Sequence, residues 1–230
     1  MYRKLDPTRT VSTIITLNKR IDERFPGAGL GKVCGELCVV ANASKERSEK
    51  IARPDYLLRS LVAIITVLGL LALGYSISLM EISFSTIEAG EFVQIVEAGL
   101  NDLVFIAAAI FFLITVETRI KRSRALDALH ELRAIAHVID MHQLTKDPSR
   151  LQQNVNLTSS SPEVKMTAYE LTRYLDYCSE MLSLTGKVAA LYGLNFRDGV
   201  VLATVNEIEN LTTGLSRKIW QKIVILHKLT

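Results

Sequence analysis

Cysteine is scarce in this chain, which has three cysteines among its 230 residues. Three cysteines offer no paired disulfide framework, so a reducing compartment is favoured. Residues 1–30 carry Arg3, Lys4 and Arg9 but lack the apolar core of a cleavable signal peptide. The formal net charge of +3 gives no overall footprint of nucleic-acid binding. No motif in the sequence compels one chemistry.

The longest apolar stretch is residues 60–80, where Tyr75 is the one ionisable side chain. As an α-helix this stretch measures about 30 Å, the thickness of the hydrocarbon layer of a bilayer. We therefore predict that it spans a membrane. Because no cleavable signal is expected, the same segment is predicted to direct insertion as a signal anchor.

A second apolar stretch, residues 103–116, is shorter. It gives about 21 Å of helix, and it approaches the required length if it extends from Gly99 to Ile120 with Asp102 and Glu117 at the two interfaces. We predict a second span here. The alternatives are a buried helix of a soluble domain and a re-entrant segment.

The distribution of charge predicts the orientation of this hairpin. Basic residues precede the first span (Lys45, Arg47, Lys50, Arg53, Arg59) and follow the second (Arg119, Lys121, Arg122, Arg124). The connector, residues 81–102, has no Lys or Arg and carries Glu81, Glu88, Glu91, Glu97 and Asp102. The positive-inside rule then places both termini in the cytoplasm and the acidic connector outside, in a bacterial inner membrane.

The remaining segments have the periodicity of amphipathic helices, and no convincing strand is present. Helices are expected over residues 10–25 and about 30–43, from the second span on to about residue 144, and in two C-terminal segments. The first C-terminal segment, 164–192, alternates apolar spacings of three and four, as in a coiled coil. The second has apolar residues at Val201, Val205, Ile208, Leu211, Leu215, Ile219, Ile223 and Leu226.

These patterns predict an all-α fold, a two-span transmembrane hairpin with a cytoplasmic helical bundle. The expected parts are N-terminal cytoplasmic amphipathic helices (1–56), the hairpin with its external connector (57–120, connector 81–102) and a C-terminal cytoplasmic bundle (121–230). The basic amphipathic segment 217–228 is expected to pack in the bundle, to lie on the inner leaflet, or to do both.

Two motifs near the N-terminus resemble sites but have simpler interpretations. The glycine-rich residues 27–32 precede a helix, yet Pro26 and Val33 break the spacing of a phosphate-binding loop, so a turn between helices is predicted. Cys34 and Cys38 share a helical face and are candidates for a soft metal or an oxidant sensor. Packing is the favoured interpretation for both thiols.

The densest polar group comprises His130, His137, Asp140 and His142. His130 and His137 lie about 10 Å apart along a helix, too far to bind one metal together. His137 and Met141 become ligands only if Glu207 or Glu209 joins them. A hydrogen-bonded polar layer that sets the helix register is the favoured interpretation.

Small residues in the two spans predict close helix packing. They are Gly69, Gly74, Ser78, Ala107 and Ala108, together with Ala109. Packing within one hairpin is favoured. The alternative is an oligomeric pore with Glu88, Glu91, Glu97 and Asp102 at a cation-attracting mouth. In architecture, though in no residue motif, this layout resembles the two-span effectors of bacterial conflict systems.

The function expected from the sequence is a non-enzymatic inner-membrane scaffold or sensor acting through helix–helix interaction. Its expected partners are the lipid bilayer, further copies of itself and a cytoplasmic protein, with no nucleic acid and no cofactor. Two alternatives remain open: an ion-conducting pore gated by the cytoplasmic helices, and a metal or redox sensor.

Overall fold

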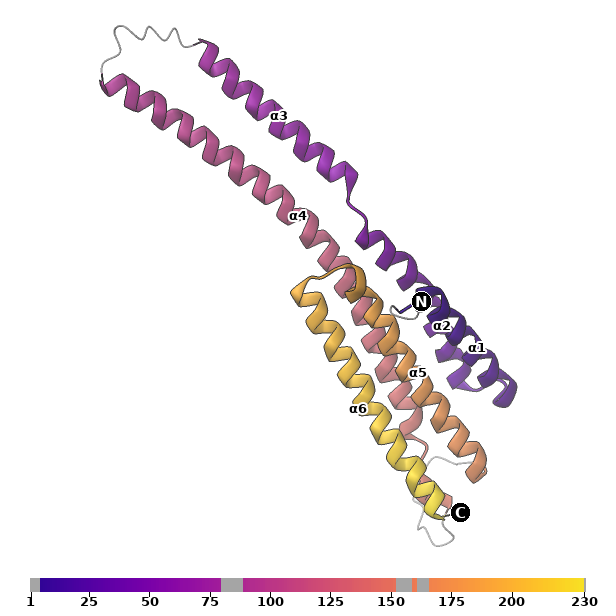
Figure 1. The fold of residues 1–230 in the computed structure, drawn as a ribbon. Helices are drawn as coiled ribbons and strands as arrows, with labels where there is room; N and C mark the ends of the chain where they lie inside the picture. The colour runs from indigo at the N-terminus through magenta and orange to yellow at the C-terminus, as the bar shows by residue number, and fades with distance from the viewer. Residues whose placement is uncertain (1–4, 80–88, 152–158, 161–165, 230) are drawn as a thin grey trace. The chain divides into compact units, whose positions relative to one another are not determined.

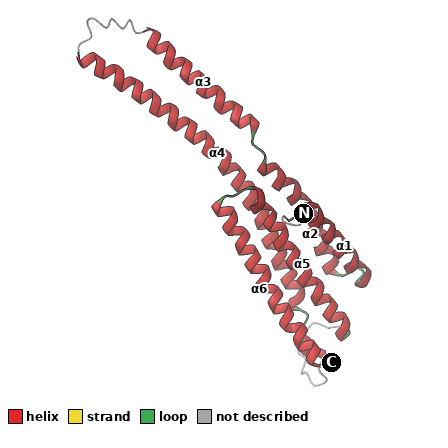
Figure 2. Ribbon diagram, in the orientation of Figure 1, coloured by secondary structure: helices red, strands yellow, loops and turns green. Residues whose placement is uncertain are grey.

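The computed structural model describes residues 5–79, 89–151, 159–160 and 166–229, and their regular structure is entirely helical (Figures 1 and 2). The helices are α1 (Pro7–Arg24), α2 (Gly29–Ala52), α3 (Tyr56–Leu79), α4 (Ala89–Leu144), η1 (Pro148–Leu151), α5 (Ala168–Asn195) and α6 (Gly199–Leu229). The prediction of an all-α chain is confirmed for these residues.

Capping residues fix several helix boundaries. The Asp6 carboxylate accepts hydrogen bonds from the backbone N–H groups of Thr8 and Arg9, and Pro7 occupies the first turn of α1. The Asp55 carboxylate accepts from the N–H of Leu58 and so caps α3. Between α1 and α2, Gly27 has a φ of +72°, which an L side chain rarely adopts.

Two helix boundaries differ from the prediction. The expected end of the second helix near residue 43 is wrong, because α2 continues to Ala52 and buries Ser44, Ser48 and Ile51 along one face. The serines interrupt the apolar pattern without ending the helix, since the charged residues between them are good helix formers. The predicted start near residue 164 lies outside the described residues, and α5 itself begins at Ala168.

Helix α5 starts with a capping box that the sequence reasoning missed. The N–H of Glu170 donates to the Thr167 hydroxyl, and the Glu170 carboxylate accepts from the backbone N–H of Thr167. Two backbone N–H groups at the start of the helix are satisfied in this way. The signature was visible in the sequence as Thr167 followed three residues later by Glu170.

The chain divides into two compact units. The first, here called the bundle unit, comprises Met1–Ala52 with Arg122–Thr230, and the second, the apolar unit, is Arg53–Lys121. The unbroken helix α4 contributes residues to both units. In this division the N-terminal and C-terminal amphipathic helices belong to one unit.

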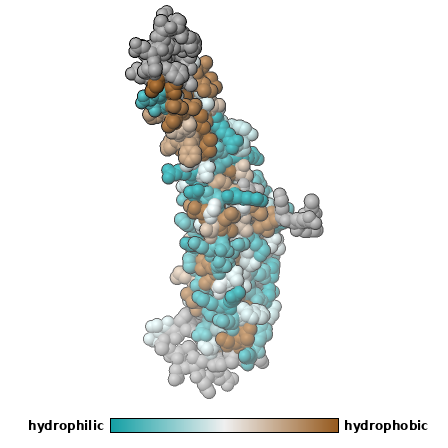
Figure 3. Space-filling view, turned by 60° about the vertical axis from the view of Figure 1, so that its left-hand side comes forward, coloured by the Kyte–Doolittle hydropathy of each residue, from teal (hydrophilic) through white to brown (hydrophobic). Residues whose placement is uncertain are grey.

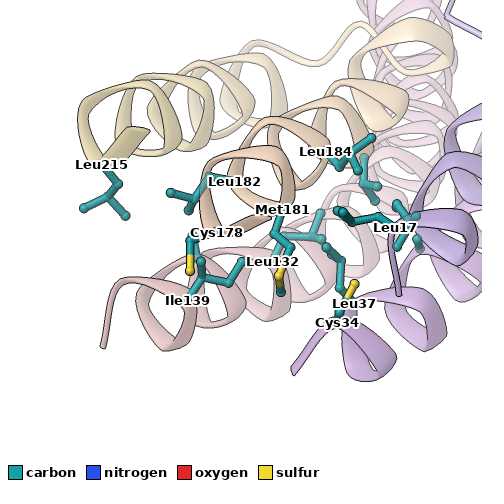
Figure 4. Close-up of a cluster of buried hydrophobic side chains, with 14 of the residues drawn as sticks. Leu17, Cys34, Leu37, Leu132, Ile139, Cys178, Met181, Leu182, Leu184 and Leu215 are labelled. Atoms are coloured by element: carbon teal, nitrogen blue, oxygen red, sulfur yellow. The ribbon is translucent and has the colours of Figure 1, made fainter. Parts of the chain in front are cut away.

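Helix α5 lies at the centre of the bundle unit, where it contacts α1, α2, α6 and η1. From Leu171 onward its predicted apolar seam is buried, whereas Ala168 is half-buried and the first seam residue, Val164, lies outside the described residues. The buried seam residues are Leu171, Leu175, Cys178, Leu182, Thr185, Ala189 and Tyr192. Figure 4 shows Cys178 of α5 beside Ile139 of α4, with Met181 near Leu132. Such close packing explains why each helix needs the others to cover its apolar face.

The apolar unit differs from the bundle unit in that many of its large apolar side chains are exposed. Exposed large apolar residues run along α3, among them Leu57, Ile64, Val67, Leu68 and Leu71, and along α4, among them Leu103, Val104, Phe105, Phe111 and Phe112. Figure 3 shows hydrophobic side chains gathered on the surface of this unit. The structure therefore contains two helical stretches long and apolar enough to cross a membrane, within Gly29–Ala72 and Gly99–Leu144, and their apolar windows are unburied.

Candidate functional site

A charged cluster joins the two helices of the apolar unit. The Glu117 carboxylate of α4 pairs with Lys121 Nζ at 2.8 Å and with Arg59 Nε of α3 at 3.3 Å, and it accepts from the backbone N–H of Asp55 at 3.3 Å. Lys121 Nζ also donates to the Arg53 carbonyl at 2.8 Å. The Glu117 side chain is only 15% exposed, so these partners compensate the loss of water. The cluster fixes the pairing of α3 with α4 at this end.

The small residues predicted to pack between the spans have different surroundings. A Cβ added at Gly69 would lie 3.4 Å from Ile106 of α4, so this glycine permits close approach within the hairpin. A Cβ at Gly74 would meet nothing within 4 Å, and Ala107 and Ala108 are exposed. Ser78 is exposed and its hydroxyl donates to the Tyr75 carbonyl of its own helix. Of these positions, Gly69 is the one that the structure places against the neighbouring helix.

The acidic residues of the predicted pore mouth are only partly described. Glu97 and Asp102 are exposed on α4. Glu91 belongs to α4, but its side chain is not described, and Glu88 lies outside the described residues. Their proposed role at a pore mouth stays a prediction.

The predicted polar layer of histidines is not assembled. His130 and His137 are exposed, because Leu129 and Ala136, one residue before each, occupy the buried face of α4. His142 is half-buried and lies against Gly29, where a Cβ would come within 2.7 Å of its Cε1. The three rings therefore occupy different surroundings.

Asp140 is the one member of that group with a buried polar partner, Gln143. The Gln143 side-chain amide donates to the Asp140 carboxylate at 2.6 Å, and Gln143 is 1% exposed. Lys222 of α6 donates its ammonium group to the carbonyls of Gln143 at 2.8 Å and Lys146 at 3.2 Å. Burial lowers the pKa of Lys222. Sequence reasoning missed this cap on the end of α4, although lysine is a common partner for terminal helix carbonyls.

The candidate metal ligands do not converge. Met141 is 67% exposed, His137 is exposed, and Glu207 pairs with Arg133. In the part of the chain that the structure describes, no group of three or more His, Cys, Asp or Glu residues is placed to hold a metal ion. Nothing in this geometry supports the metal-sensor alternative.

The glycine-rich segment 27–32 forms the turn between α1 and α2 and the first residues of α2, as predicted. The Asp22 carboxylate occupies the space in front of Gly31. An anionic phosphate in that position would meet a negative charge rather than open backbone N–H groups. The arrangement therefore opposes phosphate binding at this turn.

Cys34 and Cys38 lie on one face of α2, and both thiols are free, as is that of Cys178. Cys34 and Cys178 are fully buried, whereas Cys38 is half-buried. A hydrogen bond to Cys38 and the burial of the side chain raise the pKa of the Cys34 thiol. Burial raises the pKa of Cys178 to about 12. Both buried cysteines therefore remain protonated and inert near neutral pH.

We expect a maleimide to modify Cys38 in the folded protein and to leave Cys34 and Cys178 unmodified near neutral pH. The thiolate is the reacting form, and burial suppresses both its formation and its access to the reagent. Mass spectrometry of peptides before and after denaturation checks this. Labelling of Cys34 as fast as Cys38 in the folded protein would contradict the packing described here.

An ion pair links α4 to the turn between α5 and α6. Arg122 donates from Nε and Nη2 to the Asp198 carboxylate at 3.0 and 2.6 Å, and Asp198 is 8% exposed. The same carboxylate accepts from the backbone N–H groups of Val200 and Val201 and so caps α6. The hydrogen bond from Arg122 lowers the pKa of Asp198.

Asp198→Asn is expected to lower the free energy of unfolding by about 2 kcal/mol at neutral pH, since it removes a charged acceptor from a buried pair. Because the folded pKa is depressed, this stabilisation is present above the unfolded value of about 3.9 and is lost as pH falls through the folded value. The difference between the two proteins should therefore shrink in acid. Thermal unfolding followed by circular dichroism measures it.

The matched control is Glu131→Gln, which removes an exposed carboxylate paired with Arg47. We expect a change below about 1 kcal/mol there. An Asp198→Asn effect as small as that of the control, or one independent of pH, would contradict the role given to this pair.

The basic segment 217–228 forms part of α6. Its apolar residues Ile219, Ile223 and Leu226 are buried in the bundle core, whereas Trp220 is 64% exposed. The apolar face is thus used for packing, and the exposed side chains of Trp220 and Ile225, the latter at 46%, are available to other contacts.

Comparison of the chain with models of protein families, with curated proteins and with solved structures found no match.

Proposed function

We propose that this chain is a non-enzymatic scaffold or sensor module of the bacterial inner membrane, anchored by α3 and the apolar part of α4, with both termini in the cytoplasm. The observation that most strongly supports this proposal is the difference between the two units in the burial of their apolar side chains. The bundle unit buries its apolar stripes, whereas α3 exposes Leu57, Leu68 and Leu71 at 79%, 60% and 64%. Exposed apolar surface on this scale is a liability in water and is normal in lipid.

The orientation follows from the charges at the ends of the two apolar stretches. Arg53 and Arg59 stand at the start of α3, and Arg119, Lys121 and Arg122 follow the apolar part of α4. The described residues between α3 and this basic end of α4 carry acidic Glu97 and Asp102. This asymmetry favours a cytoplasmic location for the basic ends, and so for the bundle unit.

The continuity of α4 supports a sensor or scaffold role. A single helix, Ala89–Leu144, contributes to the apolar unit and then supplies Leu129, Leu132 and Ile139 to the bundle core. A rotation or shift of this helix in the membrane would therefore act directly on side chains packed against α5. Helix shifts of this kind are an established means of switching.

Self-association is proposed through the exposed end of α4. Val138, Met141 and Leu144 recur every third residue there and are 42%, 67% and 60% exposed. An exposed apolar strip of this kind is typical of a contact surface. A second copy of the chain presents the same strip, as a two-fold interface requires.

Light scattering of the full chain in detergent tests this proposal. We expect an oligomer that dissociates when Met141→Asp is introduced, because a carboxylate at the centre of an apolar contact loses its hydration. Val39→Asp is the matched control, since Val39 is 64% exposed but belongs to α2 rather than to the strip. A strictly monomeric unmodified protein, or equal dissociation of both variants, would contradict self-association at α4.

A pore remains the second candidate. It is supported by Glu97 and Asp102, which are exposed on α4, and by Gly74, whose surface is open to a neighbouring helix. Cation conductance in planar bilayers that decreases in the variant with Glu97→Gln and Asp102→Asn would support the pore. Absence of conductance would contradict the pore and favour the scaffold or sensor role.

A further inference from the structure

Three arginines line a groove between α1 and α5 in the bundle unit. The groove has a volume of about 500 Å³ and is lined by Arg20, Glu23, Arg24, Arg173 and Tyr177. Arg20 and Arg24 lie one turn apart on α1, and Arg173 and Tyr177 one turn apart on α5. The lining therefore carries three positive charges against one negative charge.

The guanidinium groups gather around two tyrosine rings. The Cζ atoms of Arg20 and Arg173 lie 5.2 and 5.0 Å from the ring centroid of Tyr177. Arg24 lies 5.6 Å from the ring of Tyr169, whose hydroxyl is 3.4 Å from Arg24 Nη1. Contacts with aromatic rings hold the guanidinium groups in place while leaving many of their N–H donors free.

Two of the three arginines pair with a carboxylate of the protein, and each of these two keeps further N–H donors for other acceptors. Arg20 pairs with Glu180 at 2.9 Å, and Arg173 pairs with Asp176 at 2.8 Å. Among the described residues, Arg24 has no ion pair with a carboxylate. Arg24 therefore concentrates positive charge at the groove without a neutralising partner.

Tyr177 responds to this charge. Burial raises the pKa of its hydroxyl, but the hydrogen bonds from Arg173 and Arg24 outweigh burial, and the net effect lowers the pKa. Tyr177 is 2% exposed, so the hydroxyl is held in the wall of the groove.

We propose that this groove binds a small molecule bearing two or more phosphate groups, held by the guanidinium groups of Arg20, Arg24 and Arg173. Planar guanidinium groups match phosphate oxygens through paired N–H donors. Groups from two helices present such donors from two sides. The volume of about 500 Å³ exceeds a single phosphate and lies in the range of small-molecule sites.

The proposal is independent of the membrane topology, because the groove lies wholly within the bundle unit. The phosphate groups belong either to a soluble metabolite or to a lipid headgroup. Inorganic pyrophosphate tests the first source, and nanodiscs with and without cardiolipin, a lipid with two phosphate groups, test the second. Higher affinity for pyrophosphate assigns a soluble ligand, and binding confined to the lipid assigns a headgroup; each outcome supports the site.

The experiment is calorimetric titration of pyrophosphate into the full chain in neutral detergent. We expect saturable binding, and we expect Arg24→Gln and Arg173→Gln each to weaken it by about 10- to 100-fold. Arg217→Gln, which removes an exposed charge from α6, is the matched control and should leave the affinity unchanged. The binding measurements with nanodiscs use the same variants.

A variant that is expected to bind more tightly completes the test, because misfolding could explain a loss of affinity but not a gain. Glu180→Gln removes the carboxylate that competes for Arg20 and should tighten binding by about two- to fivefold. Equal affinity of all variants, displacement by sulfate at equal ionic strength, or no saturable binding of either probe would overturn the proposal.

Discussion

Replacing Leu68 by arginine is expected to remove the chain from the membrane fraction. Leu68 lies near the middle of α3 and is 60% exposed. A charge at the centre of a membrane helix costs about 2.5–3.5 kcal/mol, which shifts insertion by about 100-fold toward the aqueous form. Extraction of membranes with alkaline carbonate, followed by quantitation of the retained chain, measures the effect.

The same substitution separates a membrane helix from a soluble one. An exposed leucine on a soluble helix has little packing to lose, so arginine would be tolerated there. Val39→Arg is the matched control, because Val39 is 64% exposed on α2 and should leave membrane retention unchanged. If Leu68→Arg gave a folded protein with unchanged fractionation, α3 would not be a membrane span.

Leu132→Ala is expected to produce the largest loss of stability among single substitutions in the bundle core. Leu132 is fully buried on α4 and points toward Met181 of α5 (Figure 4). Leucine-to-alanine changes at such sites cost about 2–5 kcal/mol, because they remove buried apolar area and leave a cavity. In a unit of this size the melting temperature should fall by about 5–15 °C.

The matched control for that prediction is Val39→Ala on α2, outside the proposed self-association strip. Val39 is 64% exposed, so its truncation leaves no enclosed cavity and should change the melting temperature by a few degrees or less. Thermal unfolding followed by circular dichroism in detergent compares the two variants. Equal shifts would mean that the face of α4 carrying Leu132 is not in the core.

Apolar periodicity was sufficient to predict most of the buried faces. An amphipathic helix was predicted over residues 10–25, and the apolar residues that recur there at helical spacing, Val11, Ile14, Leu17 and Ile21, are all buried. In α6, Val201, Val205 and Ile208 are buried as expected. These predictions succeed because a helix with one apolar stripe has a single way to remove it from water.

Polar positions were harder to predict from the sequence. His130 and His137 stand one residue after buried Leu129 and Ala136, and the rotation of about 100° per residue turns them outward. The partners of Glu117, Asp198 and Lys222 come from distant segments, so no local pattern reveals them. Distant polar pairs depend on tertiary packing, which periodicity does not specify.

The most direct test of the membrane topology is labelling of single introduced cysteines with an impermeant maleimide in spheroplasts, in a chain that also carries Cys38→Ser to remove the reactive native thiol. Glu97→Cys lies on α4 between the two apolar stretches, and His130→Cys lies at an exposed site of the bundle unit. The hairpin topology predicts labelling at position 97 in intact spheroplasts and at position 130 only after the membrane is opened. Labelling of both positions from outside, or of neither until the membrane is opened, would contradict a hairpin with its bundle in the cytoplasm.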